Sequence, residues 1–172
     1  MLNVEKVLKR FGEVVTKNAR NQLKRKNDTS KLYKSLGIKI NKPQFKGAMP
    51  SLEFTWEDYG KFIDKGVRGA GGVRKTTSKY KSTNNKGKLW KIKGKNSEYK
   101  FGRSGGISAK HFTGWAKRKG ISPHAVAKAV YHQGIETTHF FSRPFDNAFK
   151  YLPDAITEAY GDDLETLFKK SL

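Results

Sequence analysis

The stretch of sequence that decides the fold is residues 3–26, NVEKVLKRFGEVVTKNARNQLKRK. Its apolar residues recur at steps of three and four, which predicts one amphipathic helix because residues at that spacing fall on the same face. The opposite face carries Lys and Arg side chains. The helix is expected to end at residues 27–30, Asn-Asp-Thr-Ser, because these side chains favour caps and turns. The predicted buried stripe consists of Val4, Val7, Leu8, Phe11, Val14, Val15, Ala19 and Leu23.

A small sheet is predicted directly after this helix. Residues 31–36 are expected to form a short helical turn, and residues 37–42 and 51–56 each alternate apolar and polar side chains. Such alternation is typical of half-buried strands, so we expect the two segments to pair through a turn at 47–50. Residues 57–64 have helical spacing again, and Gly66 is expected to close that element.

The C-terminal third predicts further helices. One spans 107–119 and stops at Gly120, and a second begins with Ser122 as its cap and Pro123 as its first residue. Residues 135–141 are expected to be extended. Residues 142–144, Ser-Arg-Pro, predict a third helix by the same pattern, and Pro153 begins its continuation. The inward-facing residues of that continuation are expected to be Ile156, Ala159, Tyr160, Leu164, Leu167 and Phe168.

Between the sheet and these helices, residues 67–106 are predicted to form a long basic arm. Residues 65–103 hold thirteen Lys and Arg and a single acid, Glu98, and their glycines and polar clusters argue against a packed core. We expect the arm to become ordered only when something covers it, with a small exposed hairpin made by residues 88–93 and 97–101. The chain therefore predicts one α+β domain over 1–172, with a long N-terminal helix, a small antiparallel sheet, C-terminal helices and this inserted arm.

Charge is the strongest chemical property of the chain. It holds 36 Lys and Arg against 15 Asp and Glu, a formal net charge of +21, which predicts attraction to polyanions. In the arm the cations alternate with Tyr80, Trp90, Tyr99 and Phe101, a pattern that suits phosphate contacts and base stacking without sequence preference. A contact with a neighbouring subunit is the equally weighted alternative. The predicted contact residues are Arg74, Lys75, Lys79, Lys81, Lys86, Lys88, Trp90, Lys91 and Lys93.

No pattern in the sequence predicts catalysis. The chain has no cysteine, and its four histidines lack the three- or four-residue spacing of a helical metal pair. The clustered carboxylates do not match a two-metal nuclease, and neither a nucleophile elbow nor a phosphate-binding loop occurs. The prediction is a protein without enzymatic activity, cofactor or metal. No segment has the length and apolarity of a signal peptide or membrane span, so we expect a soluble protein made in a cytoplasm and no membrane partner.

Three segments together resemble a known family. They are residues 31–36, KLYKSL, with the strand that follows; residues 58–69, DYGKFIDKGVRG; and residues 140–145, FFSRPF, which lead into the terminal helix. In this order they resemble the tail-completion and head–tail joining proteins of tailed bacteriophages. The resemblance covers 1–68 and 121–172, whereas residues 69–120 are longer and more basic than the family's pattern.

The resemblance implies a small α+β fold, assembly into a six- or twelve-fold ring, and no catalysis. Such a ring would sit in the virion between the portal or adaptor and the tail, next to genomic DNA. A ring contact needs two complementary faces; here a basic N-terminal half and arm stand against residues 144–172, which carry six acids and three bases. The alternative hypothesis is a basic, sequence-independent nucleic-acid-binding accessory protein. The candidate ring-interface residues are Tyr59, Phe62, Arg68, Phe141, Arg143 and Phe145.

Overall fold

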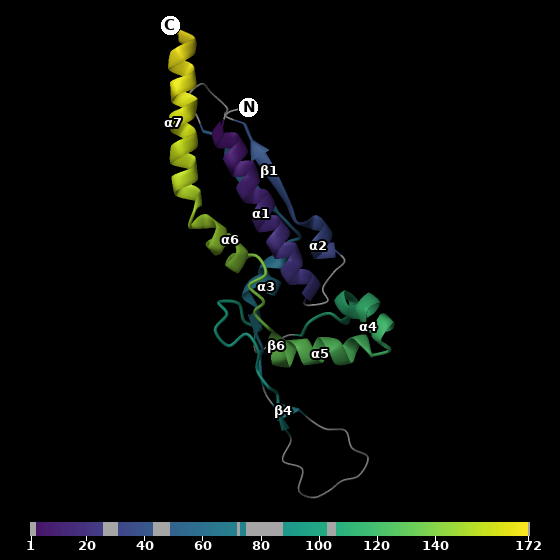
Figure 1. The fold of residues 1–172 in the computed structure, drawn as a ribbon. Helices are drawn as coiled ribbons and strands as arrows, with labels where there is room; N and C mark the ends of the chain where they lie inside the picture. The colour runs from purple at the N-terminus through teal and green to yellow at the C-terminus, as the bar shows by residue number, and fades with distance from the viewer. Residues whose placement is uncertain are drawn as a thin grey trace, which may run out of the picture. The chain divides into compact units, whose positions relative to one another are not determined.

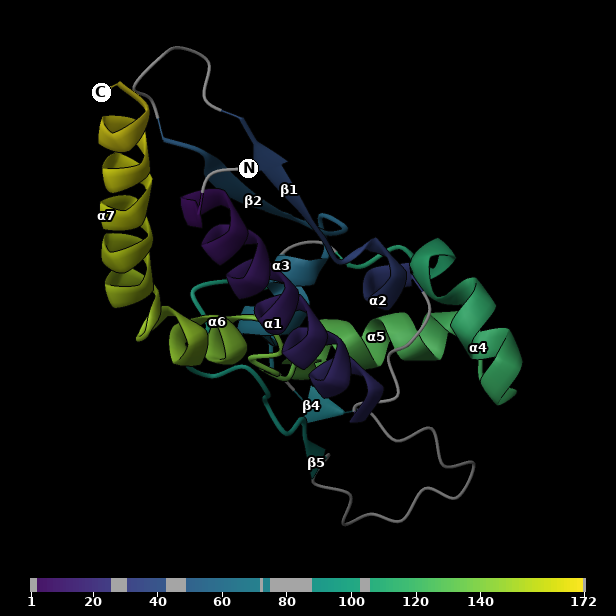
Figure 2. The same cartoon turned by 45° about the horizontal axis from the view of Figure 1, so that its top comes forward.

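The protein is described here by a computed structural model, in which the chain forms two compact units (Figures 1 and 2). Unit 1 consists of Met1–Gly60 and His139–Leu172, and unit 2 consists of Lys61–Thr138. The described residues are 3–25, 31–42, 49–71, 73–74, 88–102 and 106–171, with the backbone alone for Arg25, Val73, Arg74, Lys88, Leu89 and Ser171. The predicted α+β class is confirmed. The single domain over 1–172 stays a prediction.

Unit 1 is organised around the predicted N-terminal helix, α1 (Asn3–Arg25). Val15, Ala19 and Leu23 are completely buried on the predicted stripe, and Val4 and Leu8 share a core cluster with Ala159. One member of the stripe was predicted wrongly, because Val14 is 44% exposed. It lies about 100° around the helix from Val15, and the buried face centres on the latter.

The predicted sheet of unit 1 is confirmed as a two-stranded hairpin packed on α1. After the short helix α2 (Lys31–Ser35), β1 (Gly37–Asn41) pairs antiparallel with β2 (Ser51–Thr55). The register sets Ile40 opposite Leu52, and both side chains pack against the Val4–Leu8 cluster. The turn predicted at 47–50 lies outside the described residues up to position 48.

Two C-terminal helices complete unit 1. They are α6 (Ser142–Phe149) and α7 (Leu152–Ser171), which runs beside α1 in both views (Figures 1 and 2). The Asp163 carboxylate of α7 accepts hydrogen bonds from the backbone N–H groups of Asn3, at 2.8 Å, and Val4, at 3.1 Å. An acidic side chain at this place satisfies the free donors of a helix N-terminus and favours its dipole. Asp163 thereby fixes where α1 begins along α7.

An aromatic cluster joins α1, β2 and α6. The rings of Phe11 and Phe145 lie 5.6 Å apart and those of Phe54 and Phe141 lie 5.0 Å apart, both edge to face. Edge-to-face pairs of this kind add to the stability gained from burial alone. Phe140, beside them in sequence, is buried as well.

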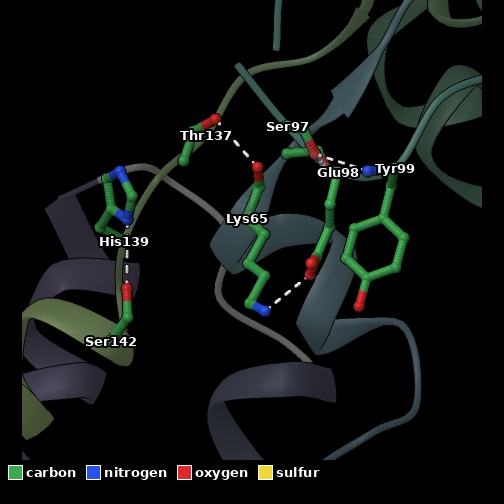
Figure 3. A network of polar contacts seen from close by, with 8 residues as sticks. Lys65, Ser97, Glu98, Tyr99, Thr137, His139 and Ser142 are labelled. Carbon is green, nitrogen blue, oxygen red and sulfur yellow. Dashed lines mark hydrogen bonds and ion pairs between the residues drawn. The ribbon is translucent and has the colours of Figure 1, made fainter. Parts of the chain in front are cut away.

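The start of α6 differs from the prediction in its cap. Ser142 is the first helical residue, and Phe141 occupies the cap position without a side-chain capping hydrogen bond. The hydroxyl of Ser142 lies instead 3.1 Å from Nδ1 of His139, the hydrogen bond drawn in Figure 3. Pro144 is therefore the third residue of the helix, where a missing N–H is still tolerated because the first four have no helical partner.

Unit 2 contains most of α3 (Gly60–Lys65), two small strand pairs and two helices. β3 (Val67–Arg68) pairs antiparallel with β6 (Gly134–Ile135), and β4 (Val73–Arg74) pairs antiparallel with β5 (Lys88–Leu89). The one-turn 3-10 helix η1 (Ala109–Phe112) leads into α4 (Thr113–Lys119), which is followed by α5 (Pro123–Gln133). Two predicted boundaries are confirmed: Gly120 ends α4 in the left-handed conformation, and Pro123 is the first residue of α5. The start predicted at residue 107 is wrong, because the α-helix begins at Thr113, after η1.

The hairpin predicted from 88–93 and 97–101 does not form. β5 pairs with β4 instead, and Lys100 forms a parallel bridge with Arg68. The glycines taken as signs of a loop have a different role here. A Cβ on Gly94 would lie 2.7 Å from the carbonyl oxygens of both Val67 and Ile135, so this glycine lets three backbone segments meet closely.

Candidate nucleic-acid and subunit interfaces

Positive charge is concentrated in unit 2. Residues 61–138 contain nineteen Lys and Arg against three Asp and Glu, a net formal charge of +16. The remaining residues, those of unit 1, contain seventeen against twelve, a net +5. Because both counts cover the whole sequence, they add up to the +21 of the chain. Unit 2 is therefore the part of the molecule whose charge attracts polyanions most strongly.

The structure describes only part of the predicted arm. Four of the predicted contact residues lie outside the described residues: Lys75, Lys79, Lys81 and Lys86. Of Arg74 and Lys88 the backbone alone is described, and these two residues pair with each other between β4 and β5. The three remaining contact residues are Trp90, Lys91 and Lys93. Both lysines are exposed, whereas Trp90 is half-buried and its ring stacks on His132 with the centroids 5.4 Å apart.

Residues 90–102 are built into unit 2 by backbone hydrogen bonds. The N–H of Lys93 donates to the carbonyl of Gln133 at 2.6 Å. Arg68 donates to the carbonyl of Tyr99 at 2.8 Å and accepts from Phe101 at 3.0 Å. The expectation that the arm orders only when something covers it is therefore wrong for this part, because the chain itself supplies the partners.

Side chains reinforce this attachment at the end of α3 (Figure 3). The Ser97 hydroxyl donates to the carbonyl of Gly66 at 2.7 Å and accepts from the N–H of Tyr99 at 3.1 Å. Lys65 Nζ donates to Glu98 Oε1 at 2.6 Å. The hydrogen bond and charge of Glu98 raise the pKa of the Lys65 ammonium, and the same hydrogen bond lowers the pKa of the Glu98 carboxyl. Both groups are well exposed, so water screens the ion pair and its effect on stability is small.

Two rings expected to stack on bases belong to the packing of unit 2. Tyr99 meets Phe62 edge to face with the centroids 4.9 Å apart, and Phe101 lies 6.0 Å from Tyr131. Trp90, Tyr99 and Phe101 each contact a ring of the same unit. The pattern of alternating cations and aromatics had suggested rings open to bases; it instead reflects a strand-like segment with its rings inward and its lysines outward.

A further group of cations, which the sequence pattern did not single out, lies on η1, α4 and α5. All five side chains are exposed, and in the described part of the chain none forms an ion pair with a carboxylate. Trp115, 46% exposed, lies among them on α4. The sequence feature that indicates this group is the absence of Asp and Glu from residues 99–135. We name this group the α4 basic surface: Lys110, Lys117, Arg118, Lys119 and Lys128.

The six candidate ring-interface residues divide by burial. Phe141 and Phe145 belong to the aromatic cluster of unit 1, and Phe62 packs on Tyr99 in unit 2. The other three, Tyr59, Arg68 and Arg143, are exposed. The structure thus gives the three phenylalanines a packing role within the units and leaves the other three at the surface.

The apolar side of α7 contradicts part of the prediction for this helix. Ala159 is buried and Ile156 packs on the α1 cluster, as expected. Beyond them the predicted inward face is exposed, with Leu167 at 58%. For Leu164, Leu167 and Phe168 the reason is the position of Asp163 at the first residues of α1, because the later turns of α7 extend past that end (Figure 1). The exposed residues of this face are Tyr160, Leu164, Leu167 and Phe168.

Among the described residues, no three His, Asp or Glu side chains are placed to hold a metal ion. No helix within the described ranges has the length and apolar character needed to span a bilayer. No protein-family model, curated protein or solved structure matches this chain.

Proposed function

We propose that this protein is a non-enzymatic structural subunit of an oligomeric ring in the head–tail connector of a tailed-phage virion. Its place would be the neck or tail-completion position, around the DNA passage. The observation that carries the proposal is the exposed apolar side of α7, where Tyr160, Leu164 and Leu167 are 46%, 37% and 58% exposed. Apolar side chains gathered on one exposed helix face favour contact with another protein.

The charge distribution supports the same function. A closed ring is built by heterologous contacts, so each subunit needs surfaces of different character. The end of α7 offers an apolar surface for protein, and unit 2, at +16, offers a cationic surface suited to DNA. The partners would be further copies of the chain in a six- or twelve-fold ring, the portal or adaptor, the tail proteins and the DNA that passes through.

The segments that resemble the tail-completion proteins form defined elements. Residues 31–36 make α2 and lead into β1, residues 58–69 make α3 and β3, and residues 140–145 lead into α6. The first two motifs each span a helix and the approach to the strand that follows it, and the third motif lies at the start of a helix. Each motif coincides with a boundary of this kind, so local geometry accounts for its residue pattern.

The test is assembly on tailless phage heads that display their portal rings. The wild-type chain is expected to co-sediment with such heads in a fixed ratio. Changing Leu164 and Leu167 together to Ser should abolish that ratio while leaving the fold intact, because both side chains are exposed. The matched control is Val14→Ser, an exposed apolar residue on α1, which should assemble normally.

A second function, a nucleic-acid-binding accessory protein without a fixed oligomer, is favoured by the charge of unit 2 alone. It predicts a chain that ignores heads and portal rings but binds DNA tightly as a monomer in low salt. Light scattering of the chain with and without heads separates the two functions. Monomeric DNA binding together with no association of the wild-type chain with heads would contradict the connector proposal.

A further inference from the structure

We infer that the α4 basic surface is a site for the phosphodiester backbone of DNA, separate from the predicted arm and indifferent to base sequence. This inference deepens the proposed function by naming the surface that meets DNA. It rests on that function only for the place of the contact in the virion, since binding itself is a property of the free chain. Its residues are Lys110, Lys117, Arg118, Lys119 and Lys128.

The geometry of α4 directs its cations into solvent. Ala116 is completely buried and anchors the helix. Successive residues of a helix are rotated by about 100°, so Lys117 and Lys119 flank the buried line and Arg118 lies nearly opposite it. The Arg118 guanidinium extends back over Gly114, where an added Cβ would lie 4.0 Å from it. The three cations therefore cover a wide arc of the helix surface.

The absence of carboxylates distinguishes this surface from an ordinary solvated helix. Helix faces exposed to water usually mix both signs of charge. Residues 99–135 contain no Asp or Glu, and the described cations of this stretch form no ion pair. By contrast, Lys169 pairs with Glu165 one turn away on α7. Repulsion among the α4 cations is thus left uncompensated until a polyanion neutralises it.

Two of the last carbonyl groups of α4 do not need these side chains as hydrogen-bond donors. Cations in a last turn often bond the final carbonyl groups or complement the helix dipole. Here the backbone N–H groups of Gly120 and Ile121 donate to the carbonyls of Lys117 and Ala116 at 3.3 and 3.0 Å. Those acceptors are satisfied without any side chain. Lys110 on η1 and Lys128 within α5 lie away from that end altogether.

Two of the acids on α7 are engaged within the chain, which leaves fewer of them for the α4 basic surface of a second copy. On α7, Asp163 is occupied at the start of α1 and Glu165 pairs with Lys169. The cations of the α4 basic surface are also spread over three elements rather than along one stripe. A regular row of phosphates can neutralise such an arrangement, and each neutralised phosphate releases counterions.

The test measures binding of short labelled duplexes of two unrelated sequences to the full chain across a salt series. Lys117→Gln, Arg118→Gln and Lys119→Gln are combined. The matched control combines Lys9→Gln, Arg10→Gln and Lys17→Gln, which removes the same charges from the exposed side of α1. The α4 variant is expected to lose at least about 10-fold in affinity and to lower the salt slope by about 2–3, since each phosphate contact contributes about 0.9. The control should retain the wild-type slope.

Equal losses in the α4 variant and its control would overturn the inference, because bulk charge would then explain the binding. A second variant, Lys110→Gln with Lys128→Gln, gives the same test should the first fail to fold by circular dichroism. Single-stranded DNA forms another arm of the experiment: stacking on Trp115 would contribute about 1–3 kcal/mol per base there, so Trp115→Ala weakens single-strand binding selectively if bases enter the site. Light scattering identifies a second copy as the true occupant if the α4 variant loses self-association and keeps DNA.

Failure of this inference differs from failure of the connector function. A chain that binds heads normally but shows no difference between the α4 variant and its control retains the proposed function and loses the DNA site. A chain that never binds heads, yet loses DNA affinity only in the α4 variant, retains the site and loses the proposed function.

Discussion

Gly134 allows the close backbone contact between β3 and β6 in unit 2. It ends α5 with φ 88° and ψ −174°, a conformation that is almost restricted to glycine. A Cβ there would lie 2.2 Å from the carbonyl oxygen of Val67 and 2.4 Å from the nitrogen of Gly69. Because glycine has only a hydrogen atom in place of Cβ, β6 can pair with β3 directly after the end of α5.

The first prediction follows from this contact. Gly134→Ala should destabilise unit 2 by about 2 kcal/mol or more, because backbone strain of about 1–3 kcal/mol adds to the clash with β3. Gly106→Ala is the control, since a Cβ at Gly106 meets nothing within 4 Å. Thermal unfolding followed by circular dichroism measures both variants. Equal melting temperatures would show that β3 and β6 separate without cost.

Among the elements, α1 and α7 show how partner length controls burial. The buried residues of α1 run from Val4 to Leu23, and the hairpin, α2, α6 and α7 all pack on this helix. α7 is covered only as far as Asp163, where α1 begins. Both helices carry apolar residues at helical spacing, and how many of these are buried depends on how much of each helix has a neighbour.

A comparison of two leucines tests this difference. Leu23→Ala should lower the free energy of unfolding by about 2–5 kcal/mol, because Leu23 is completely buried and its loss leaves a cavity. Leu167→Ala should change it by less than about 0.5 kcal/mol, since the side chain is 58% exposed. Urea unfolding of each variant gives both values. A large effect of Leu167→Ala in the isolated chain would mean that the end of α7 is covered.

At the scale of the whole molecule, the charge is divided unequally between the two units. Unit 2 carries the larger excess and two separate groups of cations: the predicted arm and the α4 basic surface. The β4–β5 pair joins Arg74 to Lys88 in register, so residues 75–87 form the connection between two adjacent chain positions. That connection can be changed without touching any of the described contacts of unit 2.

Replacing residues 75–87 with an Asn-Gly turn is therefore expected to keep the fold. Two-residue turns of this type suit antiparallel partners, and shortening a loop changes its closure entropy only slowly. The melting temperature should stay close to that of the wild-type chain. A shallower salt slope of DNA binding would identify the removed lysines as DNA contacts, and failed assembly on heads would identify the arm as a subunit contact. Global unfolding would contradict the prediction.

Much of the local structure was predictable from the sequence. Periodicity gave α1, and alternation gave β1 and β2 with their antiparallel pairing. Gly120 and the Ser122–Pro123 pair marked the end of α4 and the start of α5. These features depend on neighbouring residues: caps, turns and amphipathic faces are determined within a few positions of the chain.

The candidate surfaces were predicted less well. The sequence placed the basic contact in the arm, but Trp90, Tyr99 and Phe101 face other rings of unit 2. The α4 basic surface combines the adjacent Lys117, Arg118 and Lys119 with cations of η1 and α5, and that these three elements pack on one another is a property of the tertiary structure. Two-residue strands such as β3 and β6, whose paired residues lie 66 and 68 positions apart, leave no periodic pattern to detect.

The sequence by itself determined the class of the fold, the positions of the long helices and the net charge of +21. The tertiary structure alone decided which apolar residues are buried and which cations remain without a carboxylate partner. The end of α7 is exposed because α1 begins at the level of Asp163 and does not cover the later turns. Residues 90–102 are ordered because Arg68 and Gln133 supply hydrogen bonds. Burial and pairing depend on partners that are distant along the chain, whereas helix and strand preferences depend on near neighbours.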